Sequence, residues 1–212
     1  MVDKQHSGAA NAADCPPVAI PGTEQRLMQS PFGERKYRIF IANPLGEPPP
    51  SGFPVIYLLD ANSVFGTMVE AMRMQSRRPE KTGVVPAVIV GIGYETDAPF
   101  DPGRYYDFTL PVPPAELPER PDGRDWPESG GAEAFLTFIE ERLKPEIERD
   151  FKIDKNRQAI FGHSLGGLFV LQVLFTKPAL FRTYIAGSPS IHWNQSFFDQ
   201  ERDFVSRLQE AG

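Results

Sequence analysis

The stretch Ala159-Ile160-Phe161-Gly162-His163-Ser164-Leu165-Gly166-Gly167, read as AIFGHSLGG, decides the fold. It matches G-x-S-x-G, with a short apolar strand expected at 158–161 and a nearly all-apolar, buried helix expected at 165–175. A strand that runs through a sharp turn directly into a helix is the setting of a nucleophile elbow. The glycines leave room for a strained turn that presents the serine hydroxyl above the sheet. The stretch therefore predicts that Ser164 is a nucleophile; a turn that serves only packing, or anion binding through backbone amides, is the alternative.

The rest of the chain alternates between strand and helix patterns. Continuous apolar runs at 54–59 and 87–92 are typical of parallel strands that are covered on both faces. The other expected elements are strands at 23–30, 34–42 (near a sheet edge) and 184–186, and helices at 63–77, 132–149 and 197–210. This alternation predicts an α/β fold with a mostly parallel, doubly wound sheet, whose active site lies beyond the carboxyl ends of the strands. Residues 95–130 show no periodicity and are expected to form a functional or mobile connection.

Composition favours one soluble domain at 21–212 behind a flexible leader at 1–20. The 212 residues are 41% hydrophobic with a formal net charge of -6, which suits a single α/β core. An acidic balance without a Lys/Arg run argues against nucleic acid as a partner. The leader has no export signal and no apolar run has membrane-spanning length, so a cytoplasmic protein without membrane association is expected. Cys15 stands alone, so no intrachain disulfide can form.

A nucleophilic serine also needs donors for the oxyanion that forms on the substrate. The backbone N–H of Leu165 is the first candidate, because it follows the nucleophile at the start of a helix. A second donor is expected from the loop at 60–63, where the N–H of Ala61 or Asn62 is the candidate. The alternative is that Asp60 and Asn62 cap the following helix through their side chains; both roles can coexist.

The base that would activate the serine is harder to find. His6 lies in the leader, and His163 is too close to Ser164 in the chain for a proton relay. His192 follows a strand expected beside the elbow strand and is more readily a pocket-wall or surface residue than the base. We therefore expect the last strands of the fold to be missing, with the base and its acid encoded beyond Gly212.

Four segments together resemble the siderophore esterases of the α/β-hydrolase superfamily, which include enterobactin, salmochelin and bacillibactin esterases. The elbow matches well, and the other three segments are Y-L-L-D-A-N at 57–62, I-G-Y at 92–94 with R-Y-Y-D-F-T at 104–109, and S-P-S-I-H-W at 188–193. Two positions depart from the family pattern. Ala61 replaces the usual glycine, and His192 replaces the first of two tryptophans, which reduces the flat aromatic wall expected for a catecholate.

This resemblance implies roles for individual residues. It makes Ser164 the nucleophile, lets Arg104 contact an anionic substrate, and places Trp193 with His192 along the substrate pocket. From the residues alone, Arg104 in a long loop suits an anion clamp, or a surface arginine paired with Asp101 or Asp107.

The leading hypothesis is thus a serine esterase that cleaves a small-molecule ester, such as a ferric trilactone siderophore, through an acyl-enzyme. The alternatives are a small-acyl carboxylesterase or thioesterase, and a non-catalytic ligand-binding remnant of the fold. Without a base, this chain is expected to be weakly active at most. No cofactor is called for, and the scattered histidines and the lone cysteine predict no metal site.

Overall fold

The computed structural model describes residues 18–117, 119–120, 122–193 and 196–211. Most of the expected leader, at 1–17, therefore lies outside the described residues, together with His6 and Cys15. No helix in the described part of the chain is long and apolar enough to span a membrane.

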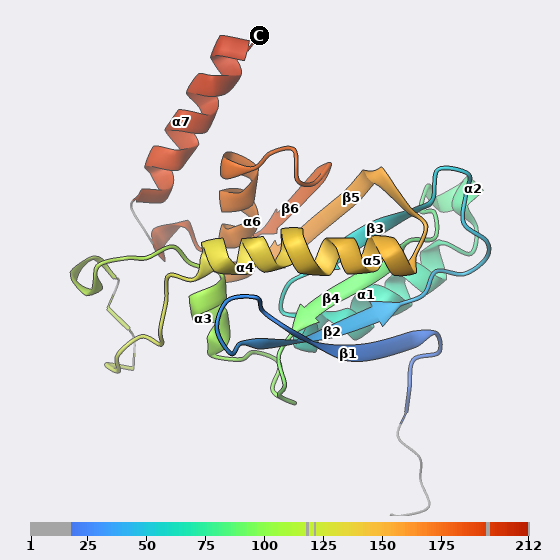
Figure 1. Cartoon of the computed structure of the whole chain (residues 1–212), viewed down its shortest axis with the longest axis horizontal. Helices are drawn as coiled ribbons and strands as arrows, with labels where there is room; N and C mark the ends of the chain where they lie inside the picture. The colour runs from blue at the N-terminus through green and yellow to red at the C-terminus, as the bar shows by residue number, and fades with distance from the viewer. Residues whose placement is uncertain (1–17, 118, 121, 194–195, 212) are drawn as a thin grey trace, which may run out of the picture.

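A six-stranded sheet with strand order β1-β2-β4-β3-β5-β6 forms the centre of the molecule (Figure 1). Strands β3, β4, β5 and β6 pair in parallel, whereas β2 pairs antiparallel with both β1 and β4. The bounds are β1 (Thr23–Gln29), β2 (Lys36–Ala42), β3 (Phe53–Leu58), β4 (Val88–Gly93), β5 (Ile153–His163) and β6 (Thr183–Gly187). The mostly parallel sheet is confirmed, and its antiparallel pairings gather at the β1 edge.

Helices connect the strands in the expected order. They are α1 (Ala61–Gln75), α2 (Pro79–Thr82), α3 (Gly103–Asp107), α4 (Ala132–Phe138), α5 (Lys144–Asp150), α6 (Leu165–Thr176) and α7 (Ser196–Ala211). The helix expected at 132–149 is one continuous rod, because a π-helical turn at Ile139–Leu143 joins α4 to α5. The segment 95–130 is less irregular than expected, since it contains α3 and a 3₁₀ turn at Pro114–Glu116.

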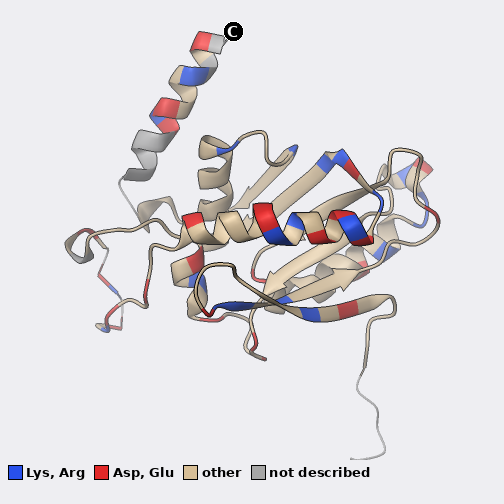
Figure 2. Ribbon diagram, viewed as in Figure 1, with Lys and Arg blue, Asp and Glu red and all other residues tan. Residues whose placement is uncertain are grey.

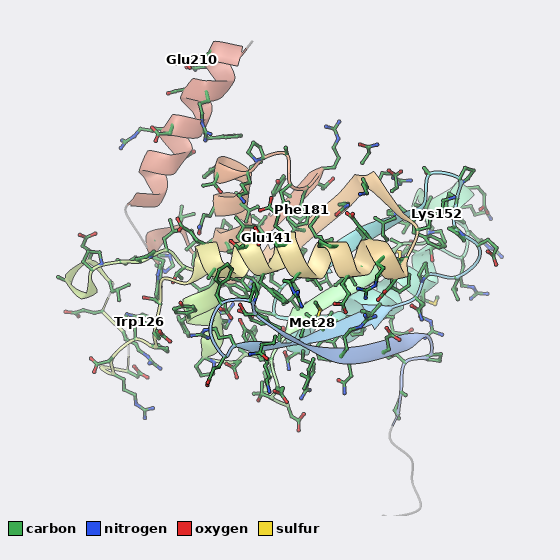
Figure 3. The ribbon with its side chains drawn as sticks, in the orientation of Figure 1. Met28, Trp126, Glu141, Lys152, Phe181 and Glu210 are labelled. Atoms are coloured by element: carbon green, nitrogen blue, oxygen red, sulfur yellow. The ribbon has the colours of Figure 1, made fainter. Side chains whose placement is uncertain are left out.

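Helices cover both faces of the sheet. Along β3, Val55 and Tyr57 point into the core shared with α4, α5 and α6, while Ile56 and Leu58 point toward α1. Figure 2 shows acidic and basic residues along the α4–α5 rod, which lies across the sheet. Met28 on β1 and Phe181 before β6, both labelled in Figure 3, belong to the larger of the two cores.

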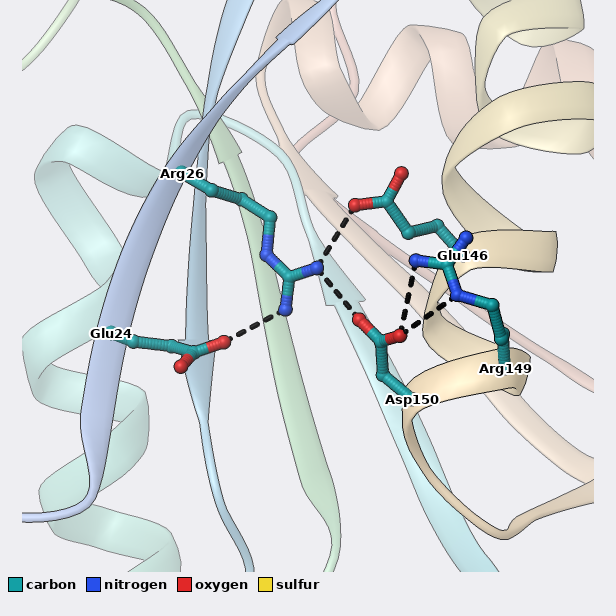
Figure 4. Close-up of polar contacts among 5 residues, drawn as sticks. All are labelled: Glu24, Arg26, Glu146, Arg149 and Asp150. Atoms are coloured by element: carbon teal, nitrogen blue, oxygen red, sulfur yellow. Dashed lines mark hydrogen bonds and ion pairs between the residues drawn. The ribbon is translucent and has the colours of Figure 1, made fainter.

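A cluster of charged side chains ties the β1 edge to α5 (Figure 4). Arg26 on β1 donates hydrogen bonds to Glu24 at 2.8 Å, to Glu146 at 2.9 Å and to Asp150 at 2.7 Å. The hydrogen bond from Arg26 lowers the pKa of Asp150 below its usual value. Because these side chains are partly exposed, the cluster fixes the position of the edge strand more than it adds stability.

Candidate active site

Ser164 occupies the turn between β5 and α6 with a strained backbone. Its φ of 57° and ψ of -116° are dihedral angles that a residue with a side chain rarely adopts. The turn is tight: a Cβ on Gly162 would lie 2.2 Å from the carbonyl oxygen of Gly166. Position 162 is therefore restricted to glycine by close backbone approach. The strand–turn–helix geometry predicted for the elbow is confirmed.

The end of β6 and the turn that follows it are hydrogen-bonded to the elbow through both backbone groups of Ser164. Ser164 N–H donates to the carbonyl of Gly187 at 2.9 Å, and Ser190 N–H donates to the carbonyl of Ser164 at 3.1 Å. The hydroxyl oxygens of Ser164 and Ser190 lie 3.0 Å apart and share a hydrogen bond. Sequence reasoning missed Ser190, although its place just past the strand next to the elbow strand was a usable signal.

The loop expected to supply the second oxyanion donor lies beside the elbow. Leu59 N–H donates to the carbonyl of Phe161 at 3.0 Å, which joins the ends of β3 and β5. A Cβ on Gly166 would lie 3.5 Å from both Leu59 Cβ and Asp60 Oδ2, so the beginnings of α1 and α6 are in contact. The first N–H groups of a helix have no acceptor within it. Ala61 and Leu165 are the first residues of these two helices, so unpaired donors converge on this end of the sheet.

The side chains of the loop do not cap α1. Asp60 stands at the N-cap with a left-handed φ of 53° and makes no side-chain capping hydrogen bond. Asn62 instead bridges to the segment after β4: its amide donates to the carbonyls of Tyr94 at 3.1 Å and Thr96 at 2.7 Å, and accepts from Tyr94 N–H at 2.8 Å. The alternative of side-chain capping is therefore wrong.

Arg104 is buried on α3 and forms a two-pronged ion pair with Asp60. Its Nε and Nη2 donate to the two carboxylate oxygens at 2.8 and 2.7 Å, and the side chains are only 10% and 5% exposed. Burial would lower the pKa of the guanidinium, but the hydrogen bonds with Asp60 raise it above its ordinary value. The sequence named Asp101 or Asp107 as partners of a surface arginine. Both were wrong, because the partner of the buried arginine is Asp60.

Asp107, one turn further along α3, is fully buried. Tyr37 and Tyr94 donate their hydroxyls to it at 3.0 and 2.9 Å. Burial raises the pKa of this carboxyl to about 6, although both tyrosine hydrogen bonds act in the opposite direction. The α3 helix is thus fixed at Arg104 to the β3–α1 loop and at Asp107 to β2 and the end of β4.

The neighbouring residues His192 and Trp193 of the S-P-S-I-H-W segment differ in burial. Trp193 is 3% exposed and packs against Tyr105 and Trp126, with ring centroids at 5.6 and 4.7 Å. Its indole N–H has no hydrogen-bond partner among the described residues. Trp126 comes from the long connection beside α3 (Figure 3). His192, by contrast, is exposed on the 3₁₀ turn Ile191–Trp193.

No histidine of the described ranges hydrogen-bonds to Ser164. His163 is exposed, and its ring lies near Gly187. The partner found for Ser164 Oγ is Ser190. The site therefore brings together Ser164, the beginnings of α1 and α6, and the buried Arg104–Asp60 ion pair.

A mixed sheet with a strained serine elbow defines this chain as an α/β-hydrolase of the serine esterase class. The putative esterase family matches residues 30–211, and the chain belongs to it.

Several relatives of the chain are siderophore esterases, which confirms the resemblance. It is 66% identical to the ferri-bacillibactin esterase BesA of Bacillus subtilis strain 168, over 96% of this chain and 69% of that protein. It is 43% identical to the siderophore enterobactin esterase of Emericella nidulans, over 88% of this chain and 65% of that protein. The crystal structure of the BES protein from Bacillus cereus matches with a TM-score of 0.87 and 47% identity, covering 93% of this chain and 74% of that one. The chain spans about two thirds of the length of the two curated relatives.

Proposed function

We propose that Ser164 is the nucleophile of a carboxylic ester hydrolase whose substrates are siderophore esters. The observation that carries this proposal is the strained backbone of Ser164 between β5 and α6. A non-glycine residue persists in such a conformation only when its surroundings fix it, and such strain clusters at active sites. Here the hydrogen bonds with Gly187 and Ser190 hold it.

The reaction follows from the groups around the elbow. The Ser164 hydroxyl attacks the ester carbonyl and loses its proton to a base, and the carbonyl oxygen becomes an oxyanion. The N–H of Leu165 and an N–H of Ala61 or Asn62 stabilise this charge, where each well-placed donor is worth about 3–4 kcal/mol. Collapse expels the alcohol and leaves an acyl-serine, which water then hydrolyses. No histidine of the described residues hydrogen-bonds to Ser164, so the residue that acts as the base is not assigned.

The substrate class rests on the relatives. Two proteins similar to this chain are named as esterases of ferri-bacillibactin and of the siderophore enterobactin. Trp193, Tyr105 and Trp126 form an aromatic cluster near the turn that holds Ser164, and aromatic surfaces suit flat ligand rings. We therefore assign trilactone siderophore esters as substrates.

A second candidate, hydrolysis of small neutral esters, is favoured by the state of Arg104. Its charge is balanced by Asp60 in a buried pair, which leaves it little attraction for an anionic substrate. His192, exposed where the family carries tryptophan, also removes part of an aromatic wall.

A fluorophosphonate probe tests the nucleophile, because it phosphonylates an activated serine irreversibly. We expect the chain to be labelled at Ser164 and the Ser164→Ala variant to remain unlabelled. A Ser76→Ala variant, which removes a hydroxyl that bonds the Met72 carbonyl at the far end of α1, serves as the control and is expected to label. Equal labelling of the chain and Ser164→Ala would refute the role of Ser164.

Substrate class is then tested by comparing bacillibactin cleavage, followed by chromatography of the linear products, with hydrolysis of 4-nitrophenyl acetate. Preference for the trilactone supports the siderophore assignment, and preference for the acetate supports the second candidate. Labelling without turnover of either ester would favour the non-catalytic ligand-binding alternative.

A further inference from the structure

We infer that the Arg104–Asp60 ion pair is a positioning device for the oxyanion loop and that Arg104 does not clamp the substrate. This inference rests on the proposed function, since it assigns the pair a role in the reaction of Ser164. Both residues would act through the backbone donors of Ala61 and Asn62, so they are positioning residues.

The ion pair fixes an unfavourable backbone conformation at the point where the donors begin. Asp60 has a left-handed φ of 53°, which an L-residue adopts only at a cost. Its two carboxylate oxygens are each bonded by a separate nitrogen of Arg104, at 2.8 and 2.7 Å. Two parallel bonds restrict rotation of the carboxylate in a way that one bond cannot. The fixed backbone of Asp60 therefore orients the N–H groups of the next two residues, Ala61 and Asn62.

The helix that carries Arg104 is itself anchored to other elements through Asp107. Asp107, one helical turn along α3, accepts hydrogen bonds from Tyr37 on β2 and from Tyr94 after β4. The Arg104 guanidinium lies over the ring of Phe108, 5.6 Å from its centroid. Because α3 is held at both positions, Arg104 presents a fixed fork to Asp60.

The same loop is fixed a second time by Asn62. Its amide makes three hydrogen bonds with backbone groups of Tyr94 and Thr96. The residues on either side of Ala61 are thus both locked through their side chains. This leaves the loop beside Gly166 with little freedom to shift, which is what a preorganised oxyanion donor requires.

A substrate clamp would need different surroundings. The guanidinium would have to offer its fork to solvent, whereas the fork is occupied and the Arg104 side chain is 10% exposed. The carboxylate of Asp60, bonded to the guanidinium through both oxygens, balances the charge of Arg104. An incoming anion would have to displace Asp60 and release the strained turn at the same time.

A matched pair of esters separates the two roles. 4-Nitrophenyl acetate is neutral and 4-nitrophenyl hemisuccinate carries a carboxylate, and both release the same chromophore. For Arg104→Lys, which keeps the charge but loses the fork, we expect kcat to fall about 100-fold on both esters with KM nearly unchanged, because a displacement near 1 Å has this effect on a reacting geometry. The rate of fluorophosphonate labelling is expected to fall by the same factor.

Arg104→Met is measured alongside, and the midpoint of thermal unfolding is recorded for each variant. If Arg104→Met does not fold, the Lys variant carries the test. Arg73→Met is the control, because its ion pair with Glu70 is exposed on α1 and should leave both rates unchanged. A rise in KM confined to the hemisuccinate, with normal labelling, would establish the clamp and overturn our inference. Absence of Ser164-dependent labelling in the unaltered chain would instead refute the proposed function.

Discussion

Replacing Gly162 by alanine places a methyl group where the backbone of α6 already lies. The new Cβ would stand 2.2 Å from the carbonyl oxygen and 2.4 Å from the carbonyl carbon of Gly166. Ordinary contacts begin near 3.4 Å, so one backbone segment must move by about 1 Å. Because no flexible side chain can yield, we expect the upper range of overpacking effects, a loss of about 3 kcal/mol in the free energy of unfolding.

The other glycine of the motif provides a matched comparison. A Cβ on Gly166 would meet Asp60 Oδ2 and Leu59 Cβ at 3.5 Å, which is ordinary contact distance. Alanine favours a helix over glycine by up to about 1 kcal/mol. Gly166→Ala should therefore retain or slightly increase stability. Gly167→Ala lies between the two, since its Cβ would approach the carbonyl oxygen of Gly187 to 2.9 Å.

Thermal unfolding followed by circular dichroism measures this series. For a chain of this size, 1 kcal/mol corresponds to about 2–4 °C in Tm, so Gly162→Ala should melt roughly 10 °C below the unaltered chain. The rate of Ser164 labelling should fall about 100-fold in the same variant, since the elbow shifts by about 1 Å. A Gly162→Ala variant that melts within about 2 °C of the unaltered chain would refute the steric reasoning. So would a Gly166→Ala variant as unstable as Gly162→Ala.

Three further predictions concern single groups. The raised pKa of Asp107, about 6 against roughly 3.9 when unfolded, means that the folded chain binds the proton more tightly. Stability should therefore fall by about 3 kcal/mol in total as pH rises from well below about 4 to well above about 6, with about 2 kcal/mol of this loss between about pH 4 and about pH 6; Asp107→Asn should lose this dependence in urea titrations, and a variant with the same pH profile as the unaltered chain would contradict it. Ser190→Ala removes the 3.0 Å hydrogen bond to Ser164 Oγ, whose net worth of about 0.5–1.5 kcal/mol predicts a 2- to 12-fold change in the rate of labelling; no change would show that Ser190 does not hold the nucleophile. Added imidazole should accelerate Ser164 labelling more than it accelerates decay of the probe, because no described histidine contacts the serine. The Ser164→Ala variant gives the background, and a rate independent of imidazole would show that a base is already in place.

Local pattern predicted much of the architecture. The apolar runs at 54–59 and 87–92 became β3 and β4, and the G-x-S-x-G stretch became the elbow. These features are encoded by neighbours in the chain: a buried strand needs consecutive apolar residues, and a tight turn needs glycine. The serine could be identified from sequence for the same reason.

The ends of the elements and the contacts between distant elements were harder to predict from the sequence. The strand expected at 158–161 extends from Ile153 to His163, because pairing with β3 and β6 lengthens it. The short α3 inside 95–130 carries no periodic signal in five residues. It is stabilised by contacts with distant strands through Asp107.

The sequence by itself predicted the fold class, the serine elbow and the two loops proposed to supply oxyanion donors, because each depends on residues adjacent in the chain. Only the tertiary structure showed which residues Arg104 and Ser190 contact. Arg104 meets Asp60 from 44 positions away, and Ser190 meets Ser164 across 26. Nearby acidic residues in the sequence pointed to the wrong partners for Arg104, since charge pairing in a folded chain follows spatial proximity and burial. Arg104, for which the sequence suggested an anion clamp or a surface ion pair, lies in a buried ion pair with Asp60.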